Sequence, residues 1–229
     1  MTSPLLVIDN LVVRYDNTPV LEGVTFCVKE GDLVGITGQN GSGKSTLLKT
    51  ICRKIRENSG SITFAGKDLK SIEPHQLVRG WCGKSENSLN IGISTLWQSS
   101  LVFPSLTVQE HIQMALQMNP FHQHSLSLDA IYAEFEPRGL PDLRKRLAGN
   151  LSGGQRQLLS LAILMGHNNC FWQLDEPFAG LDAGMVDFTI DWLRKKNKAG
   201  VTMLVVAHEI ERLQQFCKIS RKIERGYLQ

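Results

Sequence analysis

The sequence contains few cysteines, and none of them is arranged as a pair. They are scattered over 229 residues with no Cys-x-x-Cys spacing, and their number is odd. This pattern argues against a disulfide framework and against a zinc site built from cysteine pairs. It predicts a protein of a reducing compartment, which favours a cytoplasmic location. The five are Cys27, Cys52, Cys82, Cys170 and Cys217.

Long hydrophobic runs and a strong net charge are also missing. The longest apolar runs, such as Val201 to Ala207, are far shorter than the ~20 residues that a membrane helix needs. The first residues show no basic region followed by an apolar core, so we expect no signal peptide. A net charge of +3 is too small to indicate a nucleic acid partner. The remaining composition is that of a globular protein, long enough for one large domain or two lobes.

One stretch combines a glycine-rich loop with the secondary structure that a phosphate-binding loop requires. The apolar run Leu33–Ile36 enters it, and a helical pattern with Leu47, Leu48 and Ile51 leaves it. Strand, glycine-rich loop and helix in this order are typical of a P-loop. A chance Gly/Ser-rich turn is the alternative, and the number of matched positions argues against it. The candidate phosphate-binding residues are Gly38, Gln39, Asn40, Gly41, Ser42, Gly43, Lys44, Ser45 and Thr46.

The chemistry of a polyphosphate explains these residue types. Glycines let successive backbone N–H groups turn toward an anion without a Cβ in the way. The new helix adds the positive end of its dipole. We expect Lys44 to reach the β- and γ-phosphates and the Ser45 hydroxyl to ligate Mg²⁺.

A second helix start of similar character follows much later in the chain. Ser152 and Gln155 have the spacing of a capping box, with Gly153 and Gly154 between them. Two glycines in a first turn lower helix propensity, so they need another reason. The close approach of a backbone or a phosphate supplies that reason. We therefore predict a second anion-binding helix start, with Gly166 at the end of its helix.

Three polar residues follow buried strands further along. Asp175 and Glu176 end the run that begins at Cys170, and His208 follows the β-branched run from Val201 to Val206. Of two adjacent carboxylates, the first can bind Mg²⁺ and the second can orient a water molecule as a base. An acidic turn and a structural histidine are the simpler alternatives. The P-loop upstream favours the functional interpretation.

Most of the remaining strand signals come from alternating apolar residues. Residues 5–30 predict an antiparallel β piece, and residues 91–96 predict a strand that ends just before Gln98. Residues 219–229 predict a short strand with a turn. Residues 68–90 are mixed and polar, and no pattern places them.

Residues 99–150 change character and predict helices. Thr107 and Glu110 have the spacing of a capping box, and an amphipathic pattern follows them. Residues 128–135 predict a second short helix. Pro141 predicts the start of a third, because proline suits the first turn of a helix.

The order of these motifs resembles that of the nucleotide-binding subunits of ABC transporters over nearly the whole chain. A Leu-Ser-Gly-Gly-Gln signature after a P-loop is highly specific, whereas a P-loop alone occurs in many kinases and GTPases. Besides the P-loop, the resemblance rests on Gln98, Leu151–Gln155, Leu174–Pro177, Ala179–Asp182 and His208.

The resemblance implies an α/β fold of the P-loop NTPase (RecA-like) class. Residues 1–98 and 151–229 would form the α/β lobe with its N-terminal antiparallel β piece, and residues 99–150 an inserted α-helical lobe. The whole chain, 1–229, would be a single ABC ATPase domain. Two such subunits, identical or close paralogues, would bind head to tail with two ATP molecules between them. The P-loop of one subunit would then face the signature helix of the other.

The resemblance also implies a role for each candidate residue. Ser45, Gln98 and Asp175 would arrange Mg²⁺ and its water, Glu176 would orient or deprotonate the attacking water, and His208 would stabilise the γ-phosphate. The residues that would complete the partner's ATP site and align the two halves are Ser152, Gly153, Gly154, Gln155 and Asp182. Tyr15 either stacks on the nucleobase or is an exposed strand tyrosine, and its spacing does not decide between these.

The implied function is an ATPase subunit that energises transport through a separate integral membrane permease, at the inner face of the cell membrane. A non-transport ABC ATPase, acting as an assembly or regulatory switch, is the alternative. Residues 101–108 look most like importer subunits, including those for branched-chain amino acids. The apolar side chains of this stretch either fill the helical lobe's core or dock the permease. They are Leu101, Val102, Phe103 and Leu106.

Some positions depart from the family's usual pattern. Gln173 interrupts a strand that is normally apolar up to the aspartate, Ala162 stands where an arginine is common in the signature helix, and Asn169 stands where proline is common. None of these departures removes a catalytic group. They bear on how the strands pack there.

Overall fold

The computed structural model of the chain describes residues 4–16, 18–81, 90–98, 102–118, 126–217 and 219–229. Its strands are β1 (Pro4–Tyr15), β2 (Thr18–Lys29), β3 (Leu33–Thr37), β4 (Ser59–Phe64), β5 (Lys67–Asp68), β6 (Asn90–Leu96), β7 (Asn169–Asp175), β8 (Thr202–Ala207), β9 (Ile219–Glu224) and β10 (Tyr227–Leu228). Its α-helices are α1 (Lys44–Ile51), α2 (Pro74–Arg79), α3 (Val108–Gln117), α4 (Leu128–Phe135), α5 (Gly153–Gly166), α6 (Ala183–Lys198) and α7 (Ile210–Phe216).

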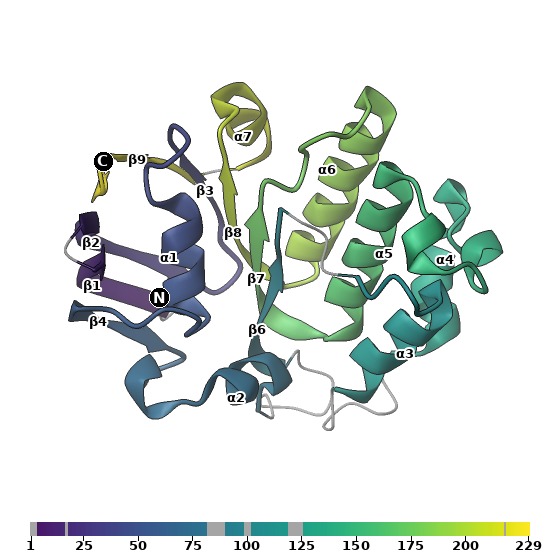
Figure 1. Ribbon diagram of the computed structural model, residues 1–229, viewed down its shortest axis with the longest axis horizontal. Helices are drawn as coiled ribbons and strands as arrows, with labels where there is room; N and C mark the ends of the chain where they lie inside the picture. The colour runs from purple at the N-terminus through teal and green to yellow at the C-terminus, as the bar shows by residue number, and fades with distance from the viewer. Residues whose placement is uncertain (1–3, 17, 82–89, 99–101, 119–125, 218) are drawn as a thin grey trace.

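Two β-sheets occupy the left and the centre of the molecule in Figure 1. The first is antiparallel, with the order β2-β1-β4-β5, and the second has the order β10-β9-β3-β8-β7-β6. In the second sheet β9, β3, β8, β7 and β6 pair in parallel, and β10 returns antiparallel to β9. The antiparallel β piece predicted near the N-terminus and the strand and turn predicted for the tail are both confirmed.

Strand β8 shows why the central strands carry long apolar runs. All of its residues are buried. Leu204 and Val206 belong to a core shared with α1 and the antiparallel sheet, whereas Met203 and Val205 belong to a core shared with α5 and α6. Because successive side chains of a strand point to opposite faces, a strand covered on both sides needs apolar residues at nearly every position. The six-stranded sheet therefore separates two hydrophobic cores.

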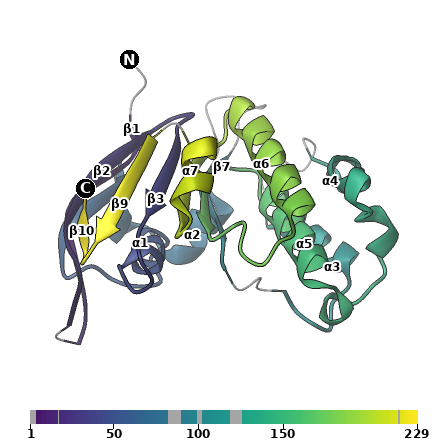
Figure 2. The same cartoon turned by 90° about the horizontal axis from the view of Figure 1, so that it is seen from above.

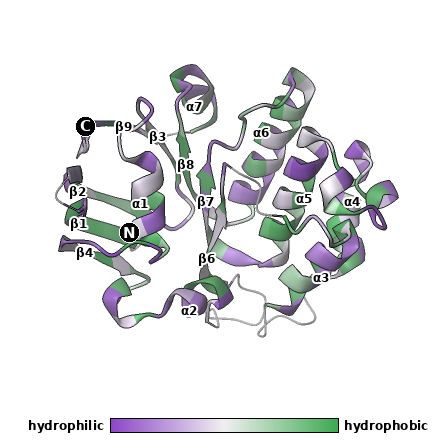
Figure 3. Ribbon diagram, in the orientation of Figure 1, coloured by the Kyte–Doolittle hydropathy of each residue, from purple (hydrophilic) through white to green (hydrophobic). Residues whose placement is uncertain are grey.

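Helices α3, α4, α5 and α6 gather at one side of the molecule, away from α1 and the antiparallel sheet (Figure 1, Figure 2). Figure 3 shows α3 and α4 with both hydrophobic and hydrophilic residues, as amphipathic helices have, while β1 is largely hydrophobic. Helix α3 buries Val108, Ile112 and Ala115, which share one helical face as predicted. No helix within the described ranges is long and apolar enough to cross a membrane.

The predicted helix starts at Thr107 and at residue 128 are confirmed. The backbone N–H of Thr107 donates to Glu110 Oε2 at 2.7 Å, and Thr107 Oγ1 accepts from the backbone N–H of Glu110 at 3.2 Å. Helix α4 begins at Leu128 after the cap Ser127. Both starts are fixed by contacts within four residues, which is why the sequence alone predicts them.

The prediction that a helix begins at Pro141 is wrong. The chain forms a single 3₁₀ turn there, over Pro141–Leu143. The carbonyl oxygens of Arg144 and Arg146 instead accept hydrogen bonds from the N–H groups of Gln109 and Val108, each at 3.0 Å. These are donors in the first turn of α3, which have no partner within their own helix. Because the backbone after Pro141 accepts hydrogen bonds from these donors, it does not continue as a helix.

Two of the departures from the family pattern, Gln173 and Asn169, are fully buried polar side chains that hydrogen-bond to neighbouring elements. Gln173 Oε1 accepts from Thr95 Oγ1 on β6 at 3.3 Å. Asn169 Nδ2 donates to the carbonyl oxygen of Val78 in α2 at 2.8 Å and to Ser94 Oγ on β6 at 3.0 Å. Side-chain hydrogen bonds thus join β7 to β6 in addition to the backbone ladder.

A buried histidine makes the fold sensitive to acid. His167 follows α5, and burial lowers the pKa of its imidazole from 6.5 to about 4. Between these values the unfolded chain binds a proton that the folded chain does not bind. The free energy of unfolding therefore falls as the pH falls through this window, by about 1.4 kcal/mol per pH unit at most.

We expect the substitution His167→Gln to reduce this acid-dependent loss of stability, because glutamine does not titrate. The measurement is the melting temperature of both proteins at about pH 7.5 and about pH 5, which bracket the titration in the unfolded chain. The native protein should lose clearly more of its melting temperature than the variant on going to the lower pH. Equal losses in the two proteins would contradict the assignment to His167.

Candidate functional site

The P-loop joins the end of β3 to the start of α1, and two of its glycines admit no other residue. A Cβ on Gly38 would lie 2.5 Å from the carbonyl oxygen of Ile223 and 2.5 Å from Ser42 Oγ. Gly43 has a φ of +107°, and a Cβ there would lie 2.7 Å from a methyl carbon of Leu21. Glycine tolerates both the close approach and the positive φ. The loop therefore folds tightly against β9 and β2.

Lys44 is the first residue of α1 and is buried. Its Nζ donates to the carbonyl oxygens of Gly38 and Gln39, at 2.7 and 3.0 Å. Burial lowers the pKa of this ammonium group, and two nearby carboxylates partly oppose the shift. On the same loop the hydroxyl of Ser42 is buried without a hydrogen-bond partner in the described part of the chain. A buried cation and an unused hydroxyl donor are groups that an anion can satisfy.

Ser45 and Asp175 bring the P-loop and the end of β7 together. Ser45 Oγ donates to Asp175 Oδ1 at 3.4 Å. Burial raises the pKa of Asp175, and this effect exceeds the opposing influence of the Ser45 hydrogen bond. A cation bound here would favour the ionised carboxylate again.

Oxygen atoms of this kind suit magnesium. Mg²⁺ prefers carboxylate, hydroxyl and water oxygens, and in ATPases it takes several ligands from phosphate and water. The described residues contain no group of three or more His, Cys, Asp and Glu side chains that could hold a metal ion by themselves. Ser45 and Asp175 therefore fit an ion that arrives together with a phosphate-bearing ligand.

Gln98, Glu176 and His208 lie beyond the ends of β6, β7 and β8 and face the P-loop across one cavity of about 320 Å³. His208 Nδ1 lies 2.9 Å from Glu176 Oε2, so the two side chains hydrogen-bond. Glu176 has a φ of 51°, and its N–H donates to the carbonyl oxygen of Val206 at 2.9 Å. The cavity is lined by Val20, Asn40, Gly41, Gly43, Lys44, Ser45, Thr46, Gln98, Glu176 and His208.

Several predicted residues lie away from this cavity. Tyr15 is 44% exposed at the end of β1 and does not line the cavity. Stacking on the nucleobase and an exposed strand tyrosine both stay open for it. The capping box before α5 is present: Ser152 Oγ accepts from the N–H of Gln155 at 3.3 Å, and Gln155 Oε1 accepts from the N–H of Ser152 at 3.0 Å. Asp182 caps α6, with Oδ1 accepting from the N–H of Met185 at 2.9 Å. These helix starts do not line the cavity either.

The two glycines that begin α5 are not explained by the fold of this chain. Among the described residues, a Cβ on Gly153 would meet no atom within 4 Å, and one on Gly154 would meet Met185 Cγ at 3.8 Å, an ordinary contact. Neither residue has a positive φ. Their lack of a side chain leaves the first turn of α5 open to something outside the chain.

The family model for the ABC transporter matches residues 21–179, well over half of the chain. The chain belongs to this family. The manganese transport system ATP-binding protein MntB of Bacillus subtilis is 32% identical over 214 residues, covering 91% of this chain and 79% of that protein. The zinc uptake system ATP-binding protein ZnuC of the same bacterium is 28% identical and covers 97% of this chain and 92% of its own length. A solved nucleotide-free ATP-binding cassette from an ABC transporter matches with a TM-score of 0.80 at 25% identity, over 99% of this chain and 90% of that one.

As an ATP-binding subunit of the ABC transporter family, the chain binds ATP and hydrolyses it. The predicted P-loop NTPase fold is confirmed by the family match and by the solved cassette. Sequence analysis missed Val20, which lines the cavity from β2. No local pattern marks Val20, because its place beside Gly43 depends on how β2 packs against the loop.

We predict that Glu176→Gln keeps ATP binding and lowers turnover by about a hundredfold or more. Glutamine fills the same space and still accepts a hydrogen bond, but it cannot take a proton from an attacking water. Titration calorimetry measures the affinity, and phosphate release measures the turnover.

Glu209→Gln is the matched control for this substitution. The Glu209 carboxylate lies 3.8 Å from Nε2 of His208, whereas Glu176 bonds Nδ1 of the same ring. The control removes a neighbouring charge and should leave turnover near the native value. Turnover of Glu176→Gln within a few-fold of native would show that the carboxylate is not the base.

Proposed function

We propose that this chain energises uptake through a separate membrane permease by ATP-driven pairing with a second ATPase subunit. The observation that carries the proposal is the separation of two glycine-containing helix starts in one chain. The P-loop faces the cavity with Gln98, Glu176 and His208, whereas Gly153 and Gly154 have no close contact that excludes a side chain within the described part of the chain. A second subunit whose own nucleotide meets the start of α5 gives these glycines a function.

The uptake direction is supported by the relatives. ZnuC is named for high-affinity zinc uptake and MntB for manganese transport. These names favour the importer class, and they lend no specific support to subunits for branched-chain amino acids. We therefore propose that the chain is an importer-type subunit, without assigning it to one substrate.

Within each ATP site, the proposed roles follow from position. Lys44 binds the β- and γ-phosphates from its buried place on the loop, and Ser45, Gln98 and Asp175 arrange Mg²⁺ and its water. Bound Mg²⁺ would neutralise the charge that develops on the phosphate oxygens. Lys44 and Ser45 begin α1 after β3, whereas Asp175 ends β7 and Gln98 follows β6, so parallel strands of one sheet fix their spacing.

Glu176 and His208 are proposed to act as a bonded pair. The Glu176 carboxylate orients and deprotonates the attacking water, and its bond to Nδ1 fixes the orientation of the imidazole. Nε2 is then the ring nitrogen left for contact with the γ-phosphate. The pair thus combines the base and the group that stabilises the transferred phosphate.

The proposed dimer gives the exposed helix starts their roles. In a head-to-tail pair, the turn that begins at Ser152 would contact the ATP of the other subunit, and Asp182 would lie where the two halves align. The other subunit is a second copy or a close paralogue. We further propose an α/β lobe of residues 1–98 and 151–229 with residues 99–150 as the inserted helical lobe.

Ser152→Arg tests the pairing. Hydrolysis per native subunit should rise with protein concentration until dimers dominate, because a single chain holds an incomplete site. The arginine adds bulk and charge at the exposed start of α5, so it should abolish this rise and leave ATP binding at the P-loop intact. Dilution series of phosphate release, with light scattering for the oligomeric state, measure both.

Gln113→Arg is the control, since it adds the same side chain at an exposed position of α3. It should keep the concentration dependence of the native protein. A native rate per subunit that stays flat while light scattering reports monomers would refute the two-subunit site.

The permease contact is proposed to include Phe103. This side chain is 57% exposed, and its ring stacks on His111 with centroids 6.0 Å apart. Val102 and Leu106 are partly buried, and Val102 packs against the core beside α3 and α5. Leu101 lies outside the described residues. The exposure of Phe103 favours docking over the alternative that it fills the helical core.

We therefore expect Phe103→Ala to leave the isolated subunit folded and its basal hydrolysis intact, and to weaken assembly with the permease. Copurification from membranes measures the assembly, and the melting temperature measures the fold. Tyr227→Ala, which removes a similarly exposed ring from β10, is the control and should assemble normally. A melting temperature lowered by many degrees, with normal assembly of the folded fraction, would place Phe103 in the core.

The same purification distinguishes the proposal from a non-transport ABC ATPase. A transport subunit copurifies with an integral membrane protein and lies on the inner face of the cell membrane through it. An assembly or regulatory switch copurifies with soluble partners. Neither outcome requires a nucleic acid, which the small net charge of the chain disfavours.

A further inference from the structure

The backbone of Glu176 has a conformation that this residue type rarely adopts. Its φ of 51° lies in the left-handed region, where the Cβ of a residue other than glycine is crowded. Such a conformation persists only where the surrounding structure fixes the chain on both sides. The contacts that fix the backbone around Glu176 therefore also decide where its carboxylate points.

On the side that precedes Glu176, the six-stranded sheet fixes the chain. Asp175 is the last residue of β7, and the N–H of Glu176 donates to the carbonyl oxygen of Val206 on β8 at 2.9 Å. The carboxylate bonds His208, which follows β8, at 2.9 Å. These contacts leave the peptide groups after Glu176 to be fixed by other elements.

On the side that follows Glu176, a side chain of the signature helix holds the chain. Gln157 lies in α5, and its Nε2 donates to the carbonyl oxygen of Pro177 at 2.9 Å. Because only the NH₂ group of an amide can donate, the contact with a carbonyl oxygen fixes the orientation of this amide. Pro177 is buried, and no other group in the described part of the chain donates to its carbonyl oxygen.

The next residue, Phe178, adds an apolar contact. Its buried ring meets the ring of Phe216 in α7 edge-on, with centroids 5.9 Å apart. An apolar contact holds the loop against the core without selecting a direction for its peptide groups, whereas a hydrogen bond does select one. The bond from Gln157 therefore sets the direction of the Pro177 carbonyl.

The proline ring passes this restraint back to Glu176. The ring fixes the φ angle of Pro177. If the carbonyl turned away to find another donor, the change would have to be taken up by ψ of Pro177 or by the dihedral angles of Glu176. A buried carbonyl that loses its donor favours such a change, since leaving it unpaired is costly.

We propose that Gln157 is a positioning residue for ATP hydrolysis, which holds the Glu176 carboxylate toward the cavity through the Pro177 peptide. The inference rests on the proposed role of Glu176 as the base. Gln157 is not among the residues that line the ATP cavity, so it acts through the backbone. It lies about one helical turn after Gly153. In the proposed dimer, the helix whose start meets the other subunit's nucleotide would therefore also hold the base of its own subunit.

Gln157→Met tests the bond, because methionine has a similar length and favours helices but has no donor. We expect kcat to fall about tenfold, since a slightly misplaced base slows the chemical step. The KM for ATP and the melting temperature should stay near the native values. Gln157→Glu is a second variant of similar size, and it should show the same split between kcat and KM because an ionised carboxylate cannot donate. Phosphate release over a range of ATP concentrations measures kcat and KM.

The double variant Gln157→Met, Glu176→Gln shows whether Gln157 acts through Glu176. Glu176→Gln already removes the base, so the added substitution should lower the remaining rate by no more than about twofold. Gln113→Met makes the same replacement at an exposed position of α3. It is the matched control and should keep the native kcat.

Native kcat, within about twofold, in both single variants at Gln157 would overturn the proposal. So would a tenfold loss that persists in the Glu176→Gln background, or a loss accompanied by a raised KM or by a melting temperature lowered by many degrees. With Glu176→Gln itself inactive, these results leave the base assignment intact. Near-native turnover of Glu176→Gln would instead refute the base, and the positioning role of Gln157 with it.

Discussion

Two oppositely charged side chains, Lys44 and Asp175, are both buried at the carboxyl ends of the parallel strands. The candidate site depends on keeping them there. Burial lowers the pKa of Lys44 and raises the pKa of Asp175, so it favours the neutral form of each group. Loop carbonyls bond the ammonium, and the Ser45 hydroxyl bonds the carboxylate, but neither charge is fully compensated. A polyphosphate would supply negative charge for the Lys44 ammonium, and a divalent cation would supply positive charge for the Asp175 carboxylate. Removing one member would leave the other buried and poorly paired.

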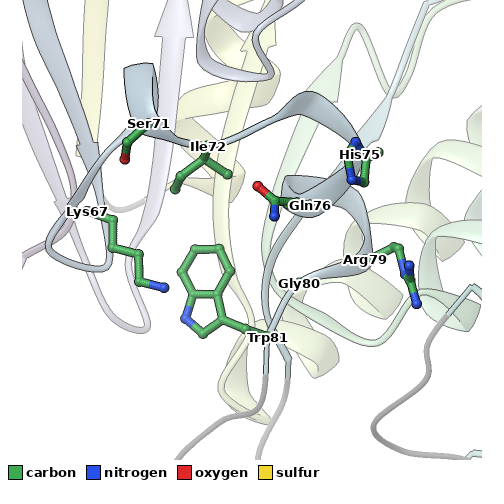
Figure 4. Close-up of a pocket in the computed structure, with 8 residues that line it drawn as sticks. All are labelled: Lys67, Ser71, Ile72, His75, Gln76, Arg79, Gly80 and Trp81. Atoms are coloured by element: carbon green, nitrogen blue, oxygen red, sulfur yellow. The ribbon is translucent and has the colours of Figure 1, made fainter.

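The parts of this arrangement that depend on near neighbours in sequence were predictable. The P-loop, the cap at Thr107 and the cap at Ser152 are each defined within a few residues, and each forms as expected. Val20 and Trp81 were not predictable as lining residues. Val20 reaches the ATP-site cavity because β2 packs on the P-loop. Trp81 lines a groove beside α2 (Figure 4) because its backbone pairs with Ile91, and residues 68–90 show no sequence pattern that predicts this pairing. Contacts between distant segments carry no local signal.

Gly166 shows how a correct position can follow from the wrong cause. Helix α5 ends at this residue as predicted, but the left-handed residue that follows the helix is Asn168, with a φ of 52°. A Cβ on Gly166 would lie 2.8 Å from the Cβ of Ala115. The glycine thus permits α5 to approach α3 closely. Pro141 fails as a helix start for a related reason, since the demand of α3 for acceptors overrides a local preference.

Backbone hydrogen bonds between distant segments also connect the stretch that carries the exposed Phe103 to the turn before the signature helix, α5. The carbonyl oxygens of Pro104 and Leu106 accept from the N–H groups of Gly149 and Ala148, at 3.1 and 2.9 Å. Ala148 and Gly149 belong to the 3₁₀ turn that leads directly into α5. These two backbone hydrogen bonds connect the segment that carries Phe103 to the turn before α5. In the proposed complex, these bonds would connect the permease contact to the turn that meets the other subunit's nucleotide, through a few peptide groups and without a long pathway.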